Sequence, residues 1–423
     1  MRGDQLLTVA DYEARSREVL PRELFDVLFG SEGAPGFEAN TNNIAAFRSI
    51  RLRPRVMVGV GARKLSTTVL RVPVELPVLL APAGYHQRAH PEGELATARA
   101  ARAAGTILTV ATASTYSIEE VAAVTDGPLW FQLYVFKDRA LDERLIARAE
   151  EAGYRALVVT VDHLGRSRER ELRYDFGRHS EHRLVRTIDP RRVLRNLAGM
   201  GLTSIPSGDA YRANFDQDFC WSDLAWLRSR TSLPLVIKGI QTAEDARLCL
   251  EHGVDGIVVS NHGGHASPDA RGTLETLPEV VDTVGKGVEV YLDGGVRRGA
   301  DVLKALALGA RAVLIGRPIF WGLAIDGESG VRHIFQILRD ELDSTMTLCG
   351  VTDVEQVDAA LVAPACPCHG GGLVVSLERL AALARSGALS AEEFAAAKAS
   401  LLRTPWRGAE HRDASAREAG EDG

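Results

Sequence analysis

Short apolar runs recur through the middle of the chain, and most are followed by a stretch with helical periodicity, such as residues 140–153 or 300–310. Strands alternating with helices predict a parallel sheet, and runs that are apolar throughout suit strands covered on both faces. Eight such units closing on themselves predict a (β/α)₈ barrel, of the TIM-barrel type, over residues 71–360. The predicted strands are Pro77–Ala81, Ile107–Ala111, Leu129–Tyr134, Ala156–Val161, Leu235–Lys238, Gly256–Ser260, Val288–Leu292 and Ala312–Ile315.

The segments around this barrel have different patterns. Residues 1–70 predict a helical segment that packs on the barrel and leads into a short strand pair. An arginine-rich interval, 163–232, separates the fourth and fifth strands; insertions after barrel strands lie over the active-site face, so we expect a lid or interaction loop. A disordered surface loop is the alternative. Residues 361–375 predict a linker, 376–402 a hairpin of two short helices, and 403–423 a disordered polar tail.

Composition limits the function classes. The chain is 45% hydrophobic and 25% charged with a net charge of −6, which suits a soluble globular protein and gives no reason to expect nucleic acid. Five scattered cysteines favour a reducing compartment. We find neither an apolar leader nor an apolar run long enough to span a membrane, so the expected location is cytoplasmic. Cys366, Cys368 and His369 lack a second ligand pair, so no metal is predicted.

Two polar residues follow apolar strands where a barrel builds its active site. Lys238 ends the fifth predicted strand, where a lysine can stabilise negative charge that develops on a cofactor. His262 follows the sixth strand, and the two glycines after it leave room for a planar ligand. A histidine there can remove a proton at neutral pH. The alternatives are a surface lysine and a hydrogen-bonded structural histidine.

Glycine-rich turns follow the seventh and eighth predicted strands, at residues 292–299 and 315–318. Barrels commonly bind phosphate between these two turns through backbone N–H groups at helix N-termini. Arg297 and Arg317 would add positive charge, and Asp293 suits a ribityl or ribose hydroxyl. The alternative is that these glycines serve only the turns.

Several longer motifs resemble one known family. SNHGG, YLDGGVRRGADVLKALALGA and AVLIGRP are similar to the flavin signature of the FMN-dependent 2-hydroxy-acid oxidases and dehydrogenases, which include glycolate oxidase, lactate oxidase and mandelate dehydrogenase. LLAPAG, AHPEGELATARAARAAGT, WFQLYV, VVTVD and VIKG extend the resemblance over roughly residues 8–360. The resemblance implies FMN as the cofactor, which performs the redox step while the protein positions and polarises.

The resemblance also implies roles for individual positions. His262 would be the catalytic base, Asp162 would stabilise its protonated form, and Tyr134 would hydrogen-bond the substrate, with Lys238 central to the site. The isoalloxazine ring would be surrounded by Ala81, Pro82, Ala83, Thr112, Gln132, Thr160 and Lys238. The ribityl phosphate would be held by Asp293, Arg297, Gly316 and Arg317, and the cofactor set is completed by Ser260 and Gly295.

The substrate positions depart from the family pattern. His265 stands where the family has the arginine that holds the substrate carboxylate, Val27 stands where it has a tyrosine, and Ala113 replaces a bulky aromatic residue. A histidine offers fewer donors than a guanidinium and can be neutral. These changes predict a roomier pocket without the usual carboxylate clamp. The alternative is that His265, or Arg271 nearby, still binds a carboxylate.

The leading hypothesis is an FMN-dependent oxidoreductase that acts on a 2-hydroxy acid or a bulkier hydroxy or amino relative. Its electron acceptor would be oxygen, a quinone or a protein, and we expect a homo-oligomer. The alternatives are a flavin-binding protein that has lost turnover and another FMN-dependent barrel enzyme, such as an isomerase. The C-terminal hairpin resembles the SHOCT module, which is thought to mediate association; Ser390 and Glu393 have capping-box spacing for its second helix.

Overall fold

The computed structural model describes residues 6–22, 24–25, 37–162, 214–265, 269–365, 390, 393–396 and 398. The chain divides into two compact units, one of Met1–Arg48 with Leu52–Val362 and one of Ser49–Arg51 with Ala363–Gly423. The predicted loop over 163–213, most of the C-terminal hairpin, and Val27 lie outside the described residues.

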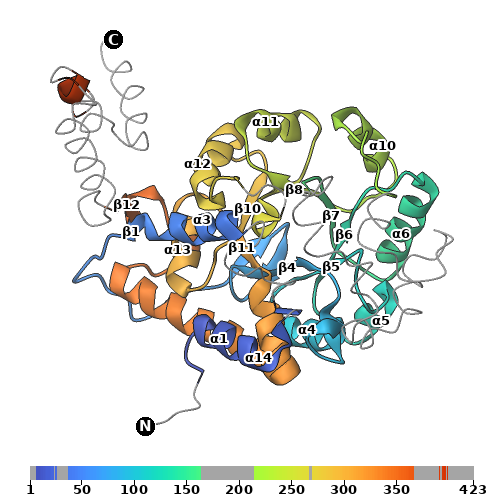
Figure 1. The fold of residues 1–423 in the computed structure, drawn as a ribbon, viewed down its shortest axis with the longest axis horizontal. Coiled ribbons are helices and arrows are strands. Elements are labelled where there is room, and N and C mark those ends of the chain that lie inside the picture. The colour runs from blue at the N-terminus through green and yellow to red at the C-terminus, as the bar shows by residue number, and fades with distance from the viewer. Residues whose placement is uncertain are drawn as a thin grey trace, which may run out of the picture. The chain divides into compact units, whose positions relative to one another are not determined.

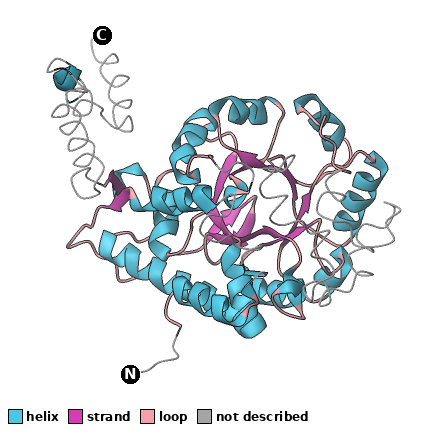
Figure 2. Ribbon diagram, viewed as in Figure 1, coloured by secondary structure: helices cyan, strands magenta, loops and turns pink. Residues whose placement is uncertain are grey.

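The larger unit contains a closed barrel of eight strands, in which each strand pairs in parallel with both neighbours (Figures 1 and 2). The predicted (β/α)₈ barrel is therefore confirmed. Its strands are β4 (Val78–Ala83), β5 (Leu108–Ala111), β6 (Leu129–Leu133), β7 (Leu157–Thr160), β8 (Leu235–Ile240), β9 (Gly256–Val259), β10 (Glu289–Asp293) and β11 (Ala312–Ile315).

Helices surround this barrel on the outside, as Figure 2 shows. They are α4 (Gly93–Ala103), α5 (Ile118–Ala123), α6 (Arg139–Glu151), α10 (Leu224–Arg228), α11 (Ala243–Glu251), α12 (Thr273–Val284), α13 (Gly299–Ala307) and α14 (Arg317–Cys349). Short 3₁₀ turns lie at η1 (His86–Arg88), η3 (Trp221–Asp223), η4 (His262–Gly264), η5 (Val354–Gln356) and η6 (Ala359–Leu361). Polar caps start several helices: Ser117 and Glu120, for example, form a reciprocal capping box on α5.

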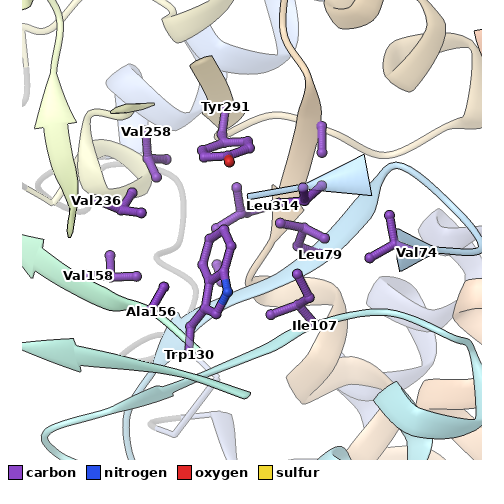
Figure 3. Packing of buried hydrophobic residues seen from close by; sticks show 13 residues of the cluster. Val74, Leu79, Ile107, Trp130, Ala156, Val158, Val236, Val258, Tyr291 and Leu314 are labelled. Atoms are coloured by element: carbon purple, nitrogen blue, oxygen red, sulfur yellow. The ribbon is translucent and has the colours of Figure 1, made fainter. Parts of the chain in front are cut away.

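The barrel interior is a packed hydrophobic core (Figure 3). Trp130 and Tyr291 point into it, and their rings meet edge to face with centroids 5.7 Å apart. Val69 and Val74 join the same cluster from an antiparallel hairpin, β2 (Thr67–Val69) and β3 (Val72–Val74). This hairpin is the strand pair that the sequence predicts before the barrel. Because the interior is filled, function is left to the strand ends.

The N-terminal segment packs against the barrel's last helix. Helix α1 (Val9–Val19) contacts α14, and the Tyr12 hydroxyl and His333 Nδ1 are hydrogen-bonded at 2.8 Å. Helix α3 (Phe37–Arg48) contacts η4 and α12. Strand β1 (Ile50–Leu52) pairs with β12 (Val362–Pro364) as a separate two-stranded sheet.

Two strands extend two residues further than the sequence predicts. β4 reaches Ala83 and β8 reaches Ile240, and both carry a register shift near that end. In β8 the irregularity centres on Gly239, whose φ of +118° is accessible mainly to glycine. Lys238 therefore lies within its strand rather than at the end of it.

The interval between the fourth and fifth barrel strands is not all loop. Residues 214–216 run beside the chain that follows β6, and η3 and α10 come after them. The predicted long loop over 163–232 thus contains a short helix in its last part, where Leu224 and Leu227 are buried.

Only a few residues of the C-terminal hairpin are described. The Ser390 hydroxyl accepts the Glu393 N–H at 3.2 Å, and a Glu393 carboxylate oxygen accepts the Ser390 N–H at 2.9 Å. The predicted capping box is formed. In the part of the chain that is described, no helix is apolar enough over a sufficient length to cross a bilayer.

Candidate active site

Lys238 links three adjacent strands at the carboxyl end of the barrel. Its Nζ lies 2.9 Å from Oδ2 of Asp293 on β10 and donates to the Ser260 hydroxyl after β9 at 2.8 Å. Burial alone would lower the pKa of this ammonium group, but the carboxylates of Asp293 and Asp162 outweigh burial and raise it. Lys238 is therefore a fixed positive charge inside the barrel mouth, only 3% exposed.

His262 is held in one orientation by its neighbours. Its Nδ1 lies 2.8 Å from Oδ1 of Asp162, and its backbone N–H donates to the Ser260 hydroxyl at 3.1 Å. Its φ of +56° is uncommon for a side chain with a Cβ, so the turn after β9 is held in a strained conformation. Strain of this kind is often found at functional sites.

Asp162 is a buried carboxylate that stays ionised. Burial would raise its pKa, but the charges of His262 and Lys238 and the hydrogen bond from His262 outweigh burial, so the pKa is below its ordinary value. A Cβ on Gly239 would lie 2.6 Å from the Cβ of Asp162, so the glycine on β8 allows this close approach. Asp162 therefore suits the stabilisation of a protonated His262.

A second polar group lies at the carboxyl ends of β5 and β6 and consists of Thr112, Gln132 and Tyr134. The Gln132 amide oxygen accepts the Thr112 N–H at 3.2 Å, and the Thr112 hydroxyl donates to the Gln132 carbonyl at 2.5 Å. The Tyr134 N–H donates to the Thr112 hydroxyl at 3.3 Å. The buried Gln132 Nε2 has no hydrogen-bond partner among the described residues, so this donor is available to a ligand.

Arg297 and Arg317 bring two guanidinium groups to the ends of β10 and β11. Burial, followed by the nearby charge of Arg297, lowers the pKa of Arg317 to about 10, and burial also lowers the pKa of Arg297. Arg317 donates to Asn40 Oδ1 at 2.6 Å and to the Gly263 carbonyl at 2.8 Å, both neutral acceptors. Two buried cations that repel each other favour an anion between them.

The N-terminus of α13 does not supply the backbone donors expected from the glycine-rich turn. Asp301 accepts the N–H groups of Arg297 and Arg298 at 3.0 and 2.9 Å, and Glu341 accepts that of Gly299 at 2.8 Å. Asp301 of α13 and Glu341 of α14 therefore already occupy these three backbone donors, and a phosphate would have to bind elsewhere in the two turns. The arginine side chains, and Gly316 next to Ala81 at the start of α14, remain as the anion-binding candidates.

Two of the three positions that depart from the family pattern, His265 and Ala113, are among the described residues. The rings of His265 and His262 are 6.3 Å apart, and Ala113 lies against Gly84 in the neighbouring βα turn. Arg271 is exposed and bonds Glu279 and the Glu275 carbonyl on α12. That geometry argues against the alternative in which Arg271 binds the substrate carboxylate.

Sequence reasoning did not identify two asparagines of α3. Asn43 and Asn261 exchange two amide hydrogen bonds of 2.9 Å, and Asn43 also accepts the Thr273 N–H at 3.0 Å. Asn40 accepts from Arg317, as described above. Asn40 and Asn43 are three residues apart and share one face of the helix. This three-residue spacing was the signal available in the sequence. Through Asn43, α3 contacts the turn that carries His262, and through Asn40 it contacts Arg317 of the anion-binding candidates.

A family model described as FMN-dependent dehydrogenase matches residues 16–364. The chain belongs to this family.

Named relatives agree with this membership. A glycolate oxidase from Spinacia oleracea is 41% identical over 367 residues, which cover 85% of this chain and 96% of the relative. A peroxisomal (S)-2-hydroxyacid oxidase from Arabidopsis thaliana is 42% identical over 362 residues, covering 84% and 95%.

Among solved structures, a soluble mutant of (S)-mandelate dehydrogenase from Pseudomonas putida is 35% identical with a TM-score of 0.76, and covers 85% of this chain and 100% of its own. A mandelate oxidase is 37% identical with a TM-score of 0.74, covering 85% and 99%. The chain is thus an FMN-dependent oxidoreductase.

The described residues fit FMN. Several buried side-chain atoms lack a partner within the described part of the chain, and each suits a part of this cofactor: donors on Gln132, Arg297 and Arg317, a hydroxyl on Thr160, and an acceptor on Asp293. Ala81, Pro82 and Ala83 line the end of β4 with small side chains, and Ser260 is fully buried. Glycines 294 and 295 have positive φ, and a Cβ on Gly295 would lie 2.6 Å from the Asn43 carbonyl oxygen.

The comparisons also correct one expectation. The predicted cytoplasmic location is contradicted by a relative that is peroxisomal by name. A peroxisomal address is a short tripeptide that a receptor reads, so hydrophobicity patterns do not reveal it. Among the described residues, no group of three or more potential metal ligands occurs, and Cys366, Cys368 and His369 lie outside them.

Proposed function

We propose that the protein oxidises a 2-hydroxy acid to the corresponding 2-oxo acid and passes two electrons to FMN. The observation that carries this proposal is the His262–Asp162 pair, 2.8 Å apart, beside the buried Lys238. Cofactor retention alone would not need a histidine oriented by a carboxylate. Bound FMN accepts the two electrons that the substrate carbon loses.

The side chains divide the remaining work. With Nδ1 of His262 bonded to Asp162, Nε2 is the nitrogen that would take the substrate's proton, and the ionised Asp162 would stabilise the resulting imidazolium. Lys238 and the Gln132 amide would stabilise negative charge that develops on the flavin. Asp293 would accept from a ribityl hydroxyl, and Arg297 and Arg317 would bind the phosphate. Tyr134 would hydrogen-bond the substrate.

For the substrate, we favour a 2-hydroxy acid with a bulky apolar or aromatic body. Ala113 and His265 are smaller or weaker groups than the family pattern has at these positions. A solved relative points the same way, since the structure of a mandelate oxidase mutant contains (S)-mandelic acid, whose hydroxyl-bearing carbon carries a phenyl ring. A hydroxy or amino relative of such an acid is the neighbouring possibility.

The electron acceptor and the assembly are further parts of the proposal. Oxygen, a quinone or a protein would reoxidise the flavin. The chain would form a homo-oligomer, and the SHOCT-like segment 376–402 would act as the association element. We also propose the domain boundaries 1–70, 71–360, 361–375, 376–402 and 403–423.

A flavin-binding protein without turnover, or an FMN-dependent isomerase, would give a different result in one experiment. The purified holoenzyme is mixed anaerobically with a panel of hydroxy acids, alcohols and amines, and the flavin absorbance is followed. Bleaching by a 2-hydroxy acid, with one equivalent of 2-oxo acid formed, is the expected result. Yellow protein that no member of the panel reduces would favour the flavin-binding alternative, and substrate isomerised without net bleaching would favour the isomerase.

A further inference from the structure

Phe215 packs directly on the active-site tyrosine. Its ring is stacked on that of Tyr134 with centroids 4.7 Å apart and an angle of 23° between the planes. Phe215 is 2% exposed, and Phe136 meets its ring edge to face at 5.5 Å. An aromatic stack of this geometry restricts both the position and the tilt of a ring.

Residues 214–216, here called the strap, are bonded to the chain that follows β6. The Lys137 N–H donates to the Asn214 carbonyl at 2.9 Å, and the Asp216 N–H donates to the Val135 carbonyl at 2.9 Å. Phe136 and Phe215 form the antiparallel bridge between these two bonds. The strap is therefore bonded, on both sides of Phe215, to the segment that carries Tyr134.

Arg139 also binds the strap. It donates to Asp216 at 2.5 Å and lies 3.7 Å from the buried carboxylate of Asp142. Its guanidinium is also 5.3 Å from the ring of Phe219 and 4.6 Å from that of Trp226 on α10. An arginine held by charge and by aromatic faces at once fixes the backbone on which Phe215 sits.

A cavity of about 270 Å³ adjoins both stacked rings. It is lined by Tyr134 and Phe215, together with the side chains of Phe219, Trp221 and Leu224. Truncation of Phe215 would enlarge space that already exists beside Tyr134, and rigid surroundings close such space only in part. The Tyr134 ring would then gain freedom on that side.

We propose that Phe215 is the positioning residue of Tyr134: its stacked ring holds the tyrosine hydroxyl where the substrate needs it, and so sets the rate at which bound substrate reduces the flavin. This inference rests on the role of Tyr134 in the proposed function. Phe215 would not touch the substrate. Since a displacement of about 1 Å can cost two orders of magnitude in rate, replacement of a ring by a branched aliphatic chain would have a measurable effect.

The test is a double-mutant cycle between these two residues, with (S)-mandelate as the substrate and stopped-flow measurement of anaerobic flavin reduction in the holoenzyme. Phe215→Leu should lower the limiting rate roughly tenfold and change the half-saturating concentration by less than about twofold. In a Tyr134→Phe background the same substitution should cost less than about twofold, because no hydroxyl is left to misplace. Phe215→Tyr keeps a stacking ring and should remain within about twofold of wild type.

Trp221→Leu is the matched control, because it shortens another aromatic wall of the same cavity without touching the stack or the Arg139 contacts; it should leave the limiting rate unchanged. If Phe215→Leu fails to fold with flavin, Phe215→Met replaces it in the cycle. Equal effects of the Phe215 substitution in both backgrounds would overturn the inference while leaving the proposed function intact. A Tyr134→Phe variant that is reduced at the wild-type rate would instead overturn the role of Tyr134, and the inference with it.

Discussion

Nδ1 of His262 lies 2.8 Å from Oδ1 of Asp162, although the two residues are one hundred positions apart and follow strands β9 and β7. The carboxylate is 6% exposed and the imidazole 21% exposed, so the pair is buried at one end and open at the other. This arrangement orients the imidazole ring through Nδ1. Nε2, the nitrogen proposed to accept the substrate's proton, therefore faces away from Asp162.

We expect His262→Asn to retain flavin and to slow its reduction by a 2-hydroxy acid by about 10²–10⁴-fold, the usual contribution of a general base. Asp162→Asn leaves the proposed base in place, but it should also slow flavin reduction, because the protonated imidazole loses its counter-charge. Stopped-flow bleaching at saturating substrate measures both. Reduction of the His262→Asn variant within a few-fold of wild type would assign the base to another residue.

Arg317→Ala should weaken FMN retention by roughly 1.5–3 kcal/mol, the worth of a charge-assisted hydrogen bond. Its buried guanidinium is paired with neutral acceptors, so it is ready for an anion. Arg298→Ala is the control: this neighbouring arginine is 57% exposed and bonded to Glu341. Equilibrium dialysis should show that the Arg317→Ala apoprotein binds FMN more weakly than the Arg298→Ala apoprotein. Equal affinities would show that Arg317 does not bind the phosphate.

Asp142 should make the protein less stable at alkaline pH. Burial raises the pKa of its carboxyl to about 7, well above the value of 3.8 expected when unfolded. The stabilising contribution of the protonated form is complete below pH ~4 and is lost as the pH rises through about 7. Asp142→Asn has no charge to bury and keeps an acceptor for the Phe136 N–H.

Urea unfolding at pH 5.5 and pH 8 measures this effect. The free energy of unfolding of the Asp142→Asn variant, relative to that of wild type, should increase by at least about 1 kcal/mol between pH 5.5 and pH 8. The same difference between the two proteins at both pH values would show that Asp142 titrates normally.

His265→Arg should raise activity toward glycolate and lactate. A small 2-hydroxy acid is anchored mainly through its carboxylate, and a guanidinium can bind that group bidentately, whereas histidine offers fewer donors. The wild-type protein should use these acids poorly and favour larger ones. Comparison of kcat/KM for lactate and mandelate in the two proteins decides the matter, and vigorous wild-type turnover of lactate would refute the predicted loss of the clamp.

Deletion of residues from 370 onward should leave flavin reduction intact and change the mass of the assembly. The helices predicted over 376–402 are short, so their apolar stripes need a partner surface. Light scattering coupled to size exclusion compares the two proteins. An unchanged mass would count against self-association, and loss of flavin would place the segment in the barrel's own structure.

The sequence by itself determined the barrel, because eight apolar runs with helical segments between them have few other ways to bury their surfaces. It also marked Lys238, His262, Arg297 and Arg317, since residues at the ends of parallel strands gather at one edge without further information. Strand ends were less certain: the irregularities at Ala83 and Gly239 depend on what packs beside them.

Contacts between distant segments were decided only in the tertiary structure. The amide pair of Asn43 and Asn261, the capping of α13 by Glu341, and the stack of Phe215 on Tyr134 each join residues that no local period relates. Such pairs form because the closed barrel brings their backbones close together, and hydrogen-bond and ring geometry select among the side chains within reach. Sequence patterns report which face of an element is buried, but they do not identify which partner lies against it.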